Sequence, residues 1–118
     1  MAQGDPIEEL RQTFSSRSFR SGFLKITILR LVSEKPMHGY AIMKEIERLT
    51  RMNWKPSPGS VYPTLRDLQA LDLVTSREEG RKLIYEITPR GSEALTAALD
   101  RVREGIEMLQ NLIEYQAE

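Results

Sequence analysis

A short run rich in proline, serine and aromatic residues holds the side chains best suited to contact a ligand. The run WKPSPGSVYPTL, residues 54–65, is followed directly by Arg66. Serine, threonine and tyrosine hydroxyls bond phosphate oxygens, and one arginine can bond O6 and N7 of guanine with two N–H groups. If the run begins a helix, these groups share its exposed first turns. The pattern therefore predicts a helix that reads DNA in the major groove.

Two serines could cap this helix. With Ser57 as N-cap, Pro58 takes the first helical position and Pro63 falls inside the helix, where it disturbs the hydrogen bonding. With Ser60 as N-cap, Pro63 lies in the first turn and is tolerated. The earlier start, with a kinked first turn, is slightly favoured. Either start predicts the same DNA contacts, from Ser57, Ser60, Tyr62, Pro63, Thr64 and Arg66. The alternative is that Tyr62 packs in the core and Arg66 is an ordinary surface charge.

Two further groups are candidates for DNA contact. Arg81 and Lys82 follow Gly80 in a predicted turn and should enter or flank the minor groove, unless they are merely solvated turn charges. His38 and Tyr40 stand at the start of another predicted helix, where backbone N–H groups face a phosphate. A capping role without DNA contact is an equal alternative for His38.

Several kinds of chemistry have no suitable residues in this sequence. The chain has no Cys and one His, so thiolate catalysis, a disulfide framework and a multi-histidine metal site are all excluded within one chain. The adjacent carboxylates Glu78 and Glu79 lie on a predicted solvent-facing turn and predict no acid–base chemistry. We therefore expect no enzyme activity, metal or cofactor. No run approaches the ~20 apolar residues that span a bilayer, so we expect a soluble, cytoplasmic protein without a membrane partner.

Charge is unevenly distributed although the net charge is zero. Residues 35–90 carry ten basic and seven acidic side chains, a balance of +3, whereas residues 91–118 carry two and six, a balance of −4. A mildly basic middle segment is compatible with nucleic-acid binding.

The remaining patterns predict the elements that position these residues. A helix over residues 22–34 is apolar on two faces and should form both core and interface. Helices over 38–52 and from the proline-rich run to about residue 72 follow. Alternating residues on both sides of EEGR then predict a β-hairpin, with Val74, Ser76, Leu83, Tyr85 and Ile87 along its strands. Pro6 after Asp5 predicts a short N-terminal helix that ends in the stretch 15–21.

The last predicted helix, residues 89–116, is long for this domain. Thr88 caps it, and its apolar residues recur about every 3.5 positions. At about 42 Å it would extend beyond a compact body, so its stripe should meet a second copy rather than fold back. The predicted dimer contacts are Leu24, Ile28, Leu95, Leu99, Val102, Ile106, Leu109 and Ile113.

These elements predict a mainly α fold with a small β-hairpin: a winged helix-turn-helix plus a long C-terminal dimerisation helix. We divide the chain into an N-terminal extension (1–21), a DNA-binding domain (22–88) and the dimerisation helix (89–118).

Three stretches carry a resemblance to a known family: HGYAIMKEIE (38–47), WKPSPGSVYPTLRDLQALDLV (54–74) and REEGRKLIYEITPRGSEAL (77–95). Together they make the chain resemble the PadR family of transcriptional regulators, in its short-tailed branch with one C-terminal helix. The resemblance implies a dimeric winged-helix repressor of double-stranded DNA. Because the family often responds to small aromatic molecules, it also suggests an effector cavity lined by Phe23, Ile26, Leu99 and Val102. The main alternative is a winged-helix module that binds protein and not DNA.

Overall fold

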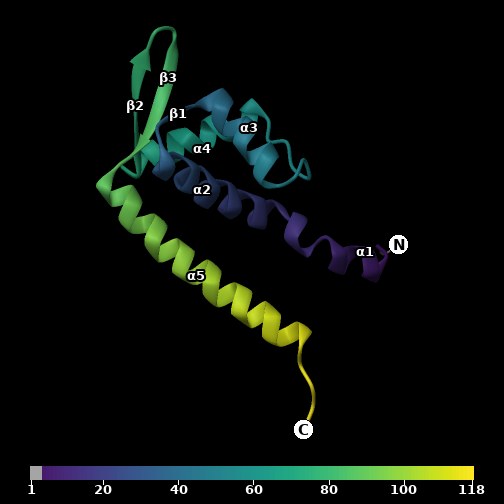
Figure 1. The fold of residues 1–118 in the computed structure, drawn as a ribbon. Helices are drawn as coiled ribbons and strands as arrows, with labels where there is room; N and C mark the ends of the chain where they lie inside the picture. The colour runs from purple at the N-terminus through teal and green to yellow at the C-terminus, as the bar shows by residue number, and fades with distance from the viewer. Residues whose placement is uncertain (1–3) are drawn as a thin grey trace.

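The computed structural model describes residues 4–118 and orders them into six helices and three strands (Figure 1). Residues 1–3 of the predicted N-terminal extension lie outside the described residues. The elements are α1 (Pro6–Arg11), the 3-10 helix η1 (Thr13–Ser15), α2 (Arg17–Glu34), β1 (Met37–His38), α3 (Gly39–Leu49), α4 (Pro58–Ala70), β2 (Val74–Glu79), β3 (Lys82–Ile87) and α5 (Pro89–Ile113).

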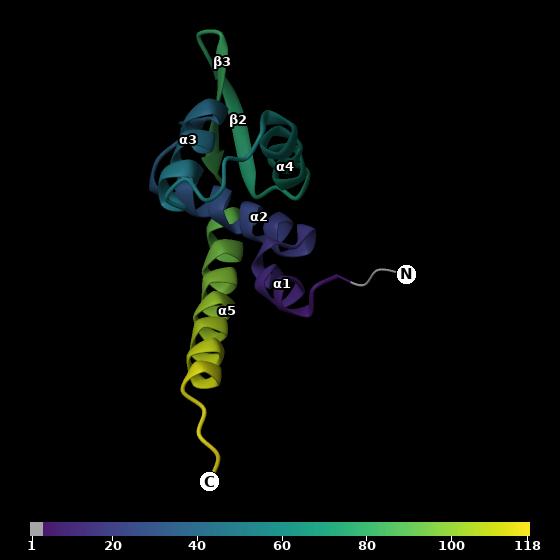
Figure 2. The same cartoon turned by 90° about the vertical axis from the view of Figure 1, so that its right-hand side faces the viewer.

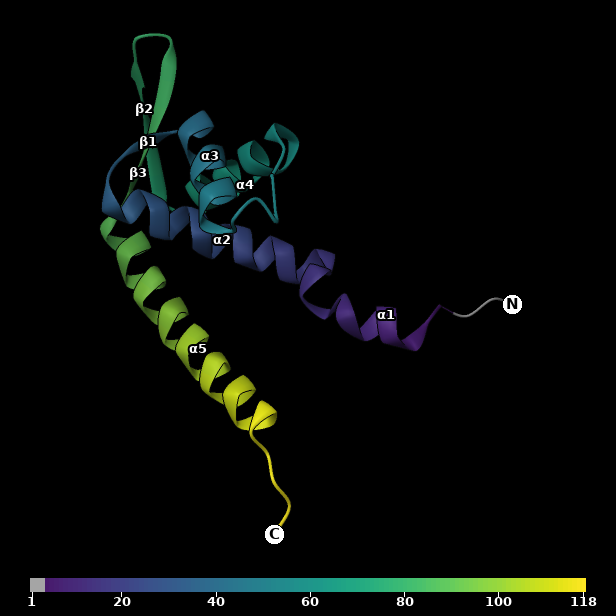
Figure 3. The same cartoon turned by 45° about the vertical axis from the view of Figure 1, so that its right-hand side comes forward.

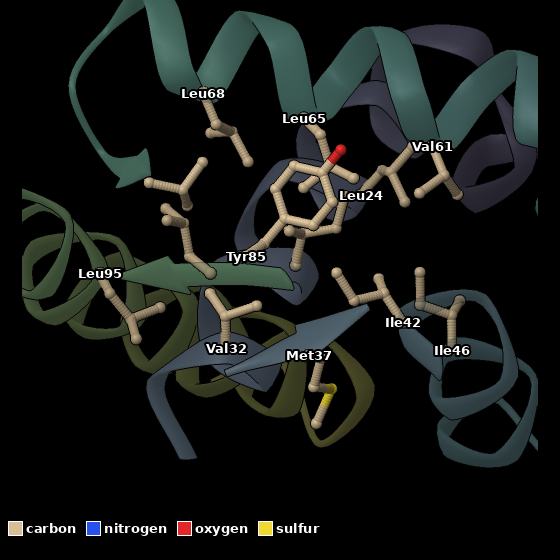
Figure 4. Packing of buried hydrophobic residues seen from close by; sticks show 13 residues of the cluster. Leu24, Val32, Met37, Ile42, Ile46, Val61, Leu65, Leu68, Tyr85 and Leu95 are labelled. Carbon is tan, nitrogen blue, oxygen red and sulfur yellow. The ribbon is translucent and has the colours of Figure 1, made fainter. Parts of the chain in front are cut away.

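The core lies where α2, α3 and α4 meet the base of the sheet (Figure 4). Each of the three helices contributes apolar residues spaced three or four apart, as an amphipathic helix requires. Those with at most 3% of their surface exposed are Leu24, Ile28 and Val32 from α2, Ile42 and Ile46 from α3, and Val61, Leu65 and Leu68 from α4. This shared burial fixes the angle between α3 and α4, the two helices of the helix-turn-helix.

The sheet has three antiparallel strands in the order β1-β3-β2. The β2–β3 hairpin is the predicted wing, but β1 is an addition that the sequence reasoning missed. Met37 pairs with Tyr85 and His38 with Ile84, so the residues expected to begin a helix instead extend the sheet. α3 begins one residue later, at Gly39.

Helix α2 begins at Arg17, five residues before the predicted start at Gly22. The N-terminal helix was predicted to end in the stretch 15–21, but α1 already ends at Arg11. That stretch instead begins α2, because Ser16 caps the helix and accepts a hydrogen bond from the Phe19 N–H at 3.1 Å. The ring of Phe19 stacks on that of Phe23, with centroids 5.7 Å apart. The helix therefore crosses the boundary that we placed between residues 21 and 22. The predicted cap of α1 is confirmed, because the Asp5 carboxylate accepts from the Ile7 N–H at 3.0 Å.

The wing closes through a tight two-residue turn. Glu79 pairs with Lys82, which leaves Gly80 and Arg81 as the turn, and Gly80 takes a φ of 66° that suits glycine. The alternation predicted for β3 holds for Tyr85, which is buried, but fails for Leu83, which is 45% exposed. Leu83 lies beside the turn, where the wing has left the body.

The start of α5 is tied to the end of α4. The Thr88 hydroxyl accepts a hydrogen bond from the Gly91 N–H (2.9 Å) and donates one to the Asp72 carbonyl (2.7 Å), and the Thr88 N–H donates to the Leu73 carbonyl (3.0 Å). Gly91 sits against the same carbonyl of Leu73, so closely that a Cβ would overlap its oxygen. The exit direction of α5 is therefore set by backbone contacts.

From this anchor, α5 runs away from the body on the side opposite the wing (Figures 2 and 3). The molecule measures 59 × 37 × 25 Å, and its radius of gyration of 17.1 Å exceeds the about 13.5 Å expected for a compact domain of this length. The predicted winged helix-turn-helix with a long C-terminal helix is confirmed, although α5 ends at Ile113 and not near residue 116. Within residues 4–118, no helix is long and apolar enough to span a membrane.

Replacing Gly91 with Ala should destabilise the protein. The added methyl group meets backbone, which cannot rotate away, so we expect a loss of about 1–3 kcal/mol in the free energy of unfolding. Chemical denaturation followed by circular dichroism measures this loss. Gly22→Ala is the matched control, because nothing lies within 4 Å of its Cβ position and a helical alanine should stabilise. A G91A protein as stable as the wild type would contradict the close approach.

Candidate nucleic-acid interface

Helix α4 starts at the earlier of the two predicted positions. Ser57 is the N-cap, with extended backbone angles of −84° and 161°, and Pro58 occupies the first helical position. Within the described chain, the Ser57 hydroxyl forms no bond to a backbone N–H; it lies 3.3 Å from the Ser60 hydroxyl. Both hydroxyls are exposed at the tip of the helix and can bond a phosphate oxygen.

Pro63 stands inside α4, and the helix continues past it to Ala70. The Thr64 hydroxyl donates to the Ser60 carbonyl at 2.8 Å. The buried inner face of α4, Val61, Leu65 and Leu68, leaves the opposite face to Gly59 and Pro63 by helical geometry.

Tyr62 combines the two roles that the sequence left open. Its ring is half-buried against the backbone of Gly39 at the start of α3, where an added Cβ would stand 2.6 Å from Cε1 and the hydroxyl oxygen. Only glycine allows the two helices to approach this closely. Arg66, one turn further along α4, is exposed, and within residues 4–118 it forms no ion pair.

The wing carries both paired and unpaired cations. Arg77 is neutralised by Glu86 at 2.9 Å and approaches Glu79 at 3.9 Å. Arg81 in the turn and Lys82 beside it are exposed and form no ion pair with any described residue. Only the cations at the tip are therefore free to meet an external anion.

His38 and Tyr40 have different surroundings. The half-buried His38 ring lies with Nδ1 3.2 Å from the Leu83 carbonyl oxygen; since a carbonyl only accepts, Nδ1 must carry the proton. This bond links the start of α3 to the wing and supports a structural role for His38. Tyr40 is 61% exposed, with the Lys44 ammonium 5.5 Å from its ring centroid, and it is available to a ligand.

Tyr85 is a supporting residue that the sequence reasoning treated only as part of a strand. Its side chain rises from β3 to lie beneath Leu65 of α4, and it is 4% exposed (Figure 4). Burial raises the pKa of its phenol above the usual value of 10; the nearby phenol of Tyr62 raises the pKa further, and the Arg66 guanidinium lowers it. The ring thus connects the wing to the helix that carries the candidate contacts. The sequence offered one signal for this role, an aromatic residue at an alternating position of the predicted strand.

The residues predicted for dimerisation differ in how exposed they are. Leu24, Ile28 and Leu95 are at most 6% exposed within one chain and belong to its core, and Leu99 is half-buried against that core. Val102 and Leu109 are each 39% exposed, Ile106 is 60% and Ile113 is 79%. The outer half of α5 therefore presents an exposed apolar stripe.

That stripe forms one wall of an open groove of about 810 Å³ between α2 and α5. All four residues predicted for an effector cavity line the groove: Phe23, Ile26, Leu99 and Val102. Phe14 and Phe19 extend the apolar lining toward the N-terminus.

The structure thus separates two surfaces. The wing, the start of α3 and the exposed flank of α4 rise from the body on one side, and α5 leaves on the other (Figure 1). The first surface carries hydroxyls and unpaired cations, which suit a polyanion, and the second is apolar, which suits another protein surface.

Comparison with known proteins gives concordant matches. Residues 28–97 match the sequence model of the Transcriptional regulator PadR-like family. Transcriptional regulator YqjI of Escherichia coli strain K12 is 41% identical over 99 residues, which make up 83% of this chain and 46% of that protein. Transcriptional regulator Rv3488 of Mycobacterium tuberculosis is 34% identical over 84 residues, 68% of this chain and 76% of that one. The chain spans about half the length of YqjI.

Among solved structures, a transcriptional regulator from Clostridium thermocellum aligns with a TM-score of 0.76. The alignment covers 84% of this chain and 98% of that chain at 23% sequence identity. At that identity the match shows a shared fold.

The buried phenol of Tyr85 predicts a specific response to alkaline pH. Because its pKa is raised above 10 in the folded state, the stability that the neutral phenol contributes is present below pH 10 and is lost as the pH rises through the raised value. A tyrosinate absorbance titration should show one of the four tyrosines ionising late, and Tyr85→Phe should remove that late component. Tyr40→Phe, at an exposed position, is the control. A late component that persists in Y85F would contradict the assignment.

Proposed function

Because the chain belongs to the PadR-like family of transcriptional regulators, we propose that it represses transcription as a homodimer bound to a pseudo-palindromic site in double-stranded DNA. The family consists of regulators, so the chain is not an enzyme. The observation that carries the proposal is a group of cations, Arg66 on α4 and Arg81 and Lys82 on the wing, that form no ion pair with any described residue. Acting on the chromosome, the protein would work in the cytoplasm.

In this proposal α4 is the recognition helix. Its outermost residues, Gly59 and Pro63, are small or rigid, so the helix can approach base edges closely. Arg66 would read a guanine, and the Thr64 methyl or Pro63 would touch a thymine methyl. Ser57, Ser60, Tyr62 and Tyr40 would bond phosphates, while Arg81 and Lys82 of the wing would follow the adjacent minor groove. His38 would orient the wing through its bond to the Leu83 carbonyl.

The uncovered stripe of α5 supports the homodimer. A monomer in water would leave Val102, Ile106, Leu109 and Ile113 in contact with solvent, and burying such a side chain is worth about 1.5–3 kcal/mol. A two-fold dimer pairs the stripes and places two recognition helices in symmetry-related positions. The bound site should then have two half-sites about 34 Å apart.

A small aromatic effector, as the resemblance suggested, would have to bind in whatever part of the α2–α5 groove the dimer leaves open. Phe23, Ile26, Leu99 and Val102 would contact it. Binding there would change how α5 is held against α2, and so the spacing of the two recognition helices.

The alternative is a winged-helix module that binds protein through the same surface. Cations without an ion-pair partner among the described residues lie on both α4 (Arg66) and the wing (Arg81 and Lys82), and this favours DNA over that alternative, because a polyanion can compensate both at once.

Replacing Arg66 and Arg81 with Ala separates these two functions. The double variant should fold and dimerise normally but lose DNA affinity by about 1–3 kcal/mol for each base-contacting arginine in each protomer. Fluorescence anisotropy on a duplex enriched by the wild-type protein measures the loss. If each protomer neutralises three to four phosphates, log K should fall with log salt at a slope of about −5 to −7 for the wild type.

Arg101→Ala is the matched control for that variant, since Arg101 is an exposed arginine on α5, 3.1 Å from Glu104. It should bind DNA as the wild type does. DNA affinity unchanged in the Arg66 and Arg81 variant, or a flat salt response of the wild type, would favour the protein-binding module.

A charge placed in the α5 stripe should dissociate the dimer. Ile106→Glu would bury a carboxylate between the two helices, so we expect a monomer by light scattering coupled to size exclusion. Met108→Glu makes the same change on the opposite face of the same helix, where Met108 is 67% exposed, and should leave the dimer intact. A dimeric I106E protein, or an equal effect of both changes, would refute this interface.

A further inference from the structure

A second cationic site lies beside α4, on the flank away from the wing. It is a pocket of about 440 Å³ between the first turns of α2 and the first turns of α4. Arg17 and Arg20 of α2 line one wall, and Ser60 and Thr64 of α4 line the other. Ser15 and Ser21 add two more hydroxyls, and none of the described residues that line the pocket is acidic. We call this site the Arg17–Arg20 pocket.

Neither arginine has its charge neutralised by a described residue. Arg30, further along the same helix, bonds the Glu34 carboxylate, and Arg48 bonds that of Glu45, so the contrast lies within one molecule. The Arg20 guanidinium lies 6.0 Å from the ring centroid of Trp54, which positions it while leaving its N–H groups free. Two unpaired guanidinium groups that face the Ser60 hydroxyl across a pocket are suited to one tetrahedral anion, whereas the Thr64 hydroxyl already donates to the Ser60 carbonyl.

The pocket has a defined position relative to the recognition helix. Ser60 and Thr64, four residues apart, share one flank of α4, while Tyr62 and Arg66 share the other. The wing packs on the second flank, where Gln69 donates to the Ser76 hydroxyl of β2 at 2.9 Å. The pocket and the wing therefore lie on opposite sides of α4.

A helix in the major groove runs between two phosphate backbones. In the proposed complex, the wing and the start of α3 would cover the DNA backbone on one side of α4. We propose that the Arg17–Arg20 pocket binds a DNA backbone phosphate on the other side. The inference rests on the proposed function, and it gives a role to the N-terminal turns of α2 that precede the core.

The test uses the full-length protein with both arginines replaced, Arg17→Gln and Arg20→Gln. Losing one phosphate contact in each protomer should make the slope of log K against log salt less negative by about 1.8 for the dimer. At 0.1 M salt the affinity should fall by about 10-fold or more. Arg17→Lys with Arg20→Lys keeps the charges and should restore most of the slope.

Phosphate-ethylation interference then identifies the source of the anion. One phosphate in each half-site should interfere when ethylated with the wild-type protein, and this interference should disappear with the R17Q/R20Q variant. The same set of interfering phosphates for both proteins would overturn the inference. It would also be overturned if the pocket bound free inorganic phosphate but the R17Q/R20Q variant bound DNA with the same affinity as the wild type.

The matched control is Arg90→Gln with Arg101→Gln, two exposed arginines on α5. It removes the same charge and should keep the wild-type slope; an equal change of slope in this control would mean a general charge effect and would refute the site. Circular dichroism and size exclusion confirm folded dimers. A wild-type protein that binds no DNA would refute the proposed function as well as this inference. A wild type that binds DNA, with an R17Q/R20Q variant of identical salt slope, would refute only this inference.

Discussion

The arrangement of the candidate nucleic-acid interface depends on the burial of one face of α4. Val61 and Leu65 have no exposed surface and Leu68 has 1%, so α4 cannot rotate about its axis without bringing these side chains into water. Tyr85 of β3 packs beneath the same face and joins the wing to the helix (Figure 4). The direction of Tyr62, Pro63 and Arg66 is therefore a consequence of core packing, and so is their distance from the wing.

Net charge says little about the function of this chain, because charge pairing decides which groups are available. Basic and acidic residues are equal in number, yet Arg30, Arg48, Arg77, Arg101 and Arg103 each lie within 4 Å of a carboxylate. The arginines that remain unpaired in the described chain include those on both flanks of α4 and at the tip of the wing. A chain with no net charge can thus still present unpaired cations on the candidate nucleic-acid interface.

The sequence predicted the fold well where the periodicity was strong. The helices of the helix-turn-helix, the wing and α5 follow from apolar spacing and from caps such as Thr88.

Three features of the structure could not be predicted from the sequence. The extension of α2 back to Arg17 depends on a serine cap and on aromatic stacking of Phe19 with Phe23. The spacing of apolar residues in the sequence indicates neither. The two-residue strand β1 exists only because β3 offers it a partner. Leu95 belongs to the core, whereas the apolar stripe that follows it is exposed, because α5 leaves the body at that point. The candidate DNA contacts were identified from the sequence by residue type. Their ion pairing and burial could be determined only from the structure.

The two surfaces fit one function only if the dimer brings two copies of the first into register. In the proposed dimer, the apolar stripe of α5 would lie on the two-fold axis, and each copy of α4 would supply one recognition helix. Selection of bound sequences from random duplex DNA by the wild-type protein tests this account most directly. We expect enrichment of an inverted repeat whose half-site centres lie about 34 Å apart, bound by one dimer. Failure to enrich any sequence, or enrichment of a single unrepeated site, would contradict the account.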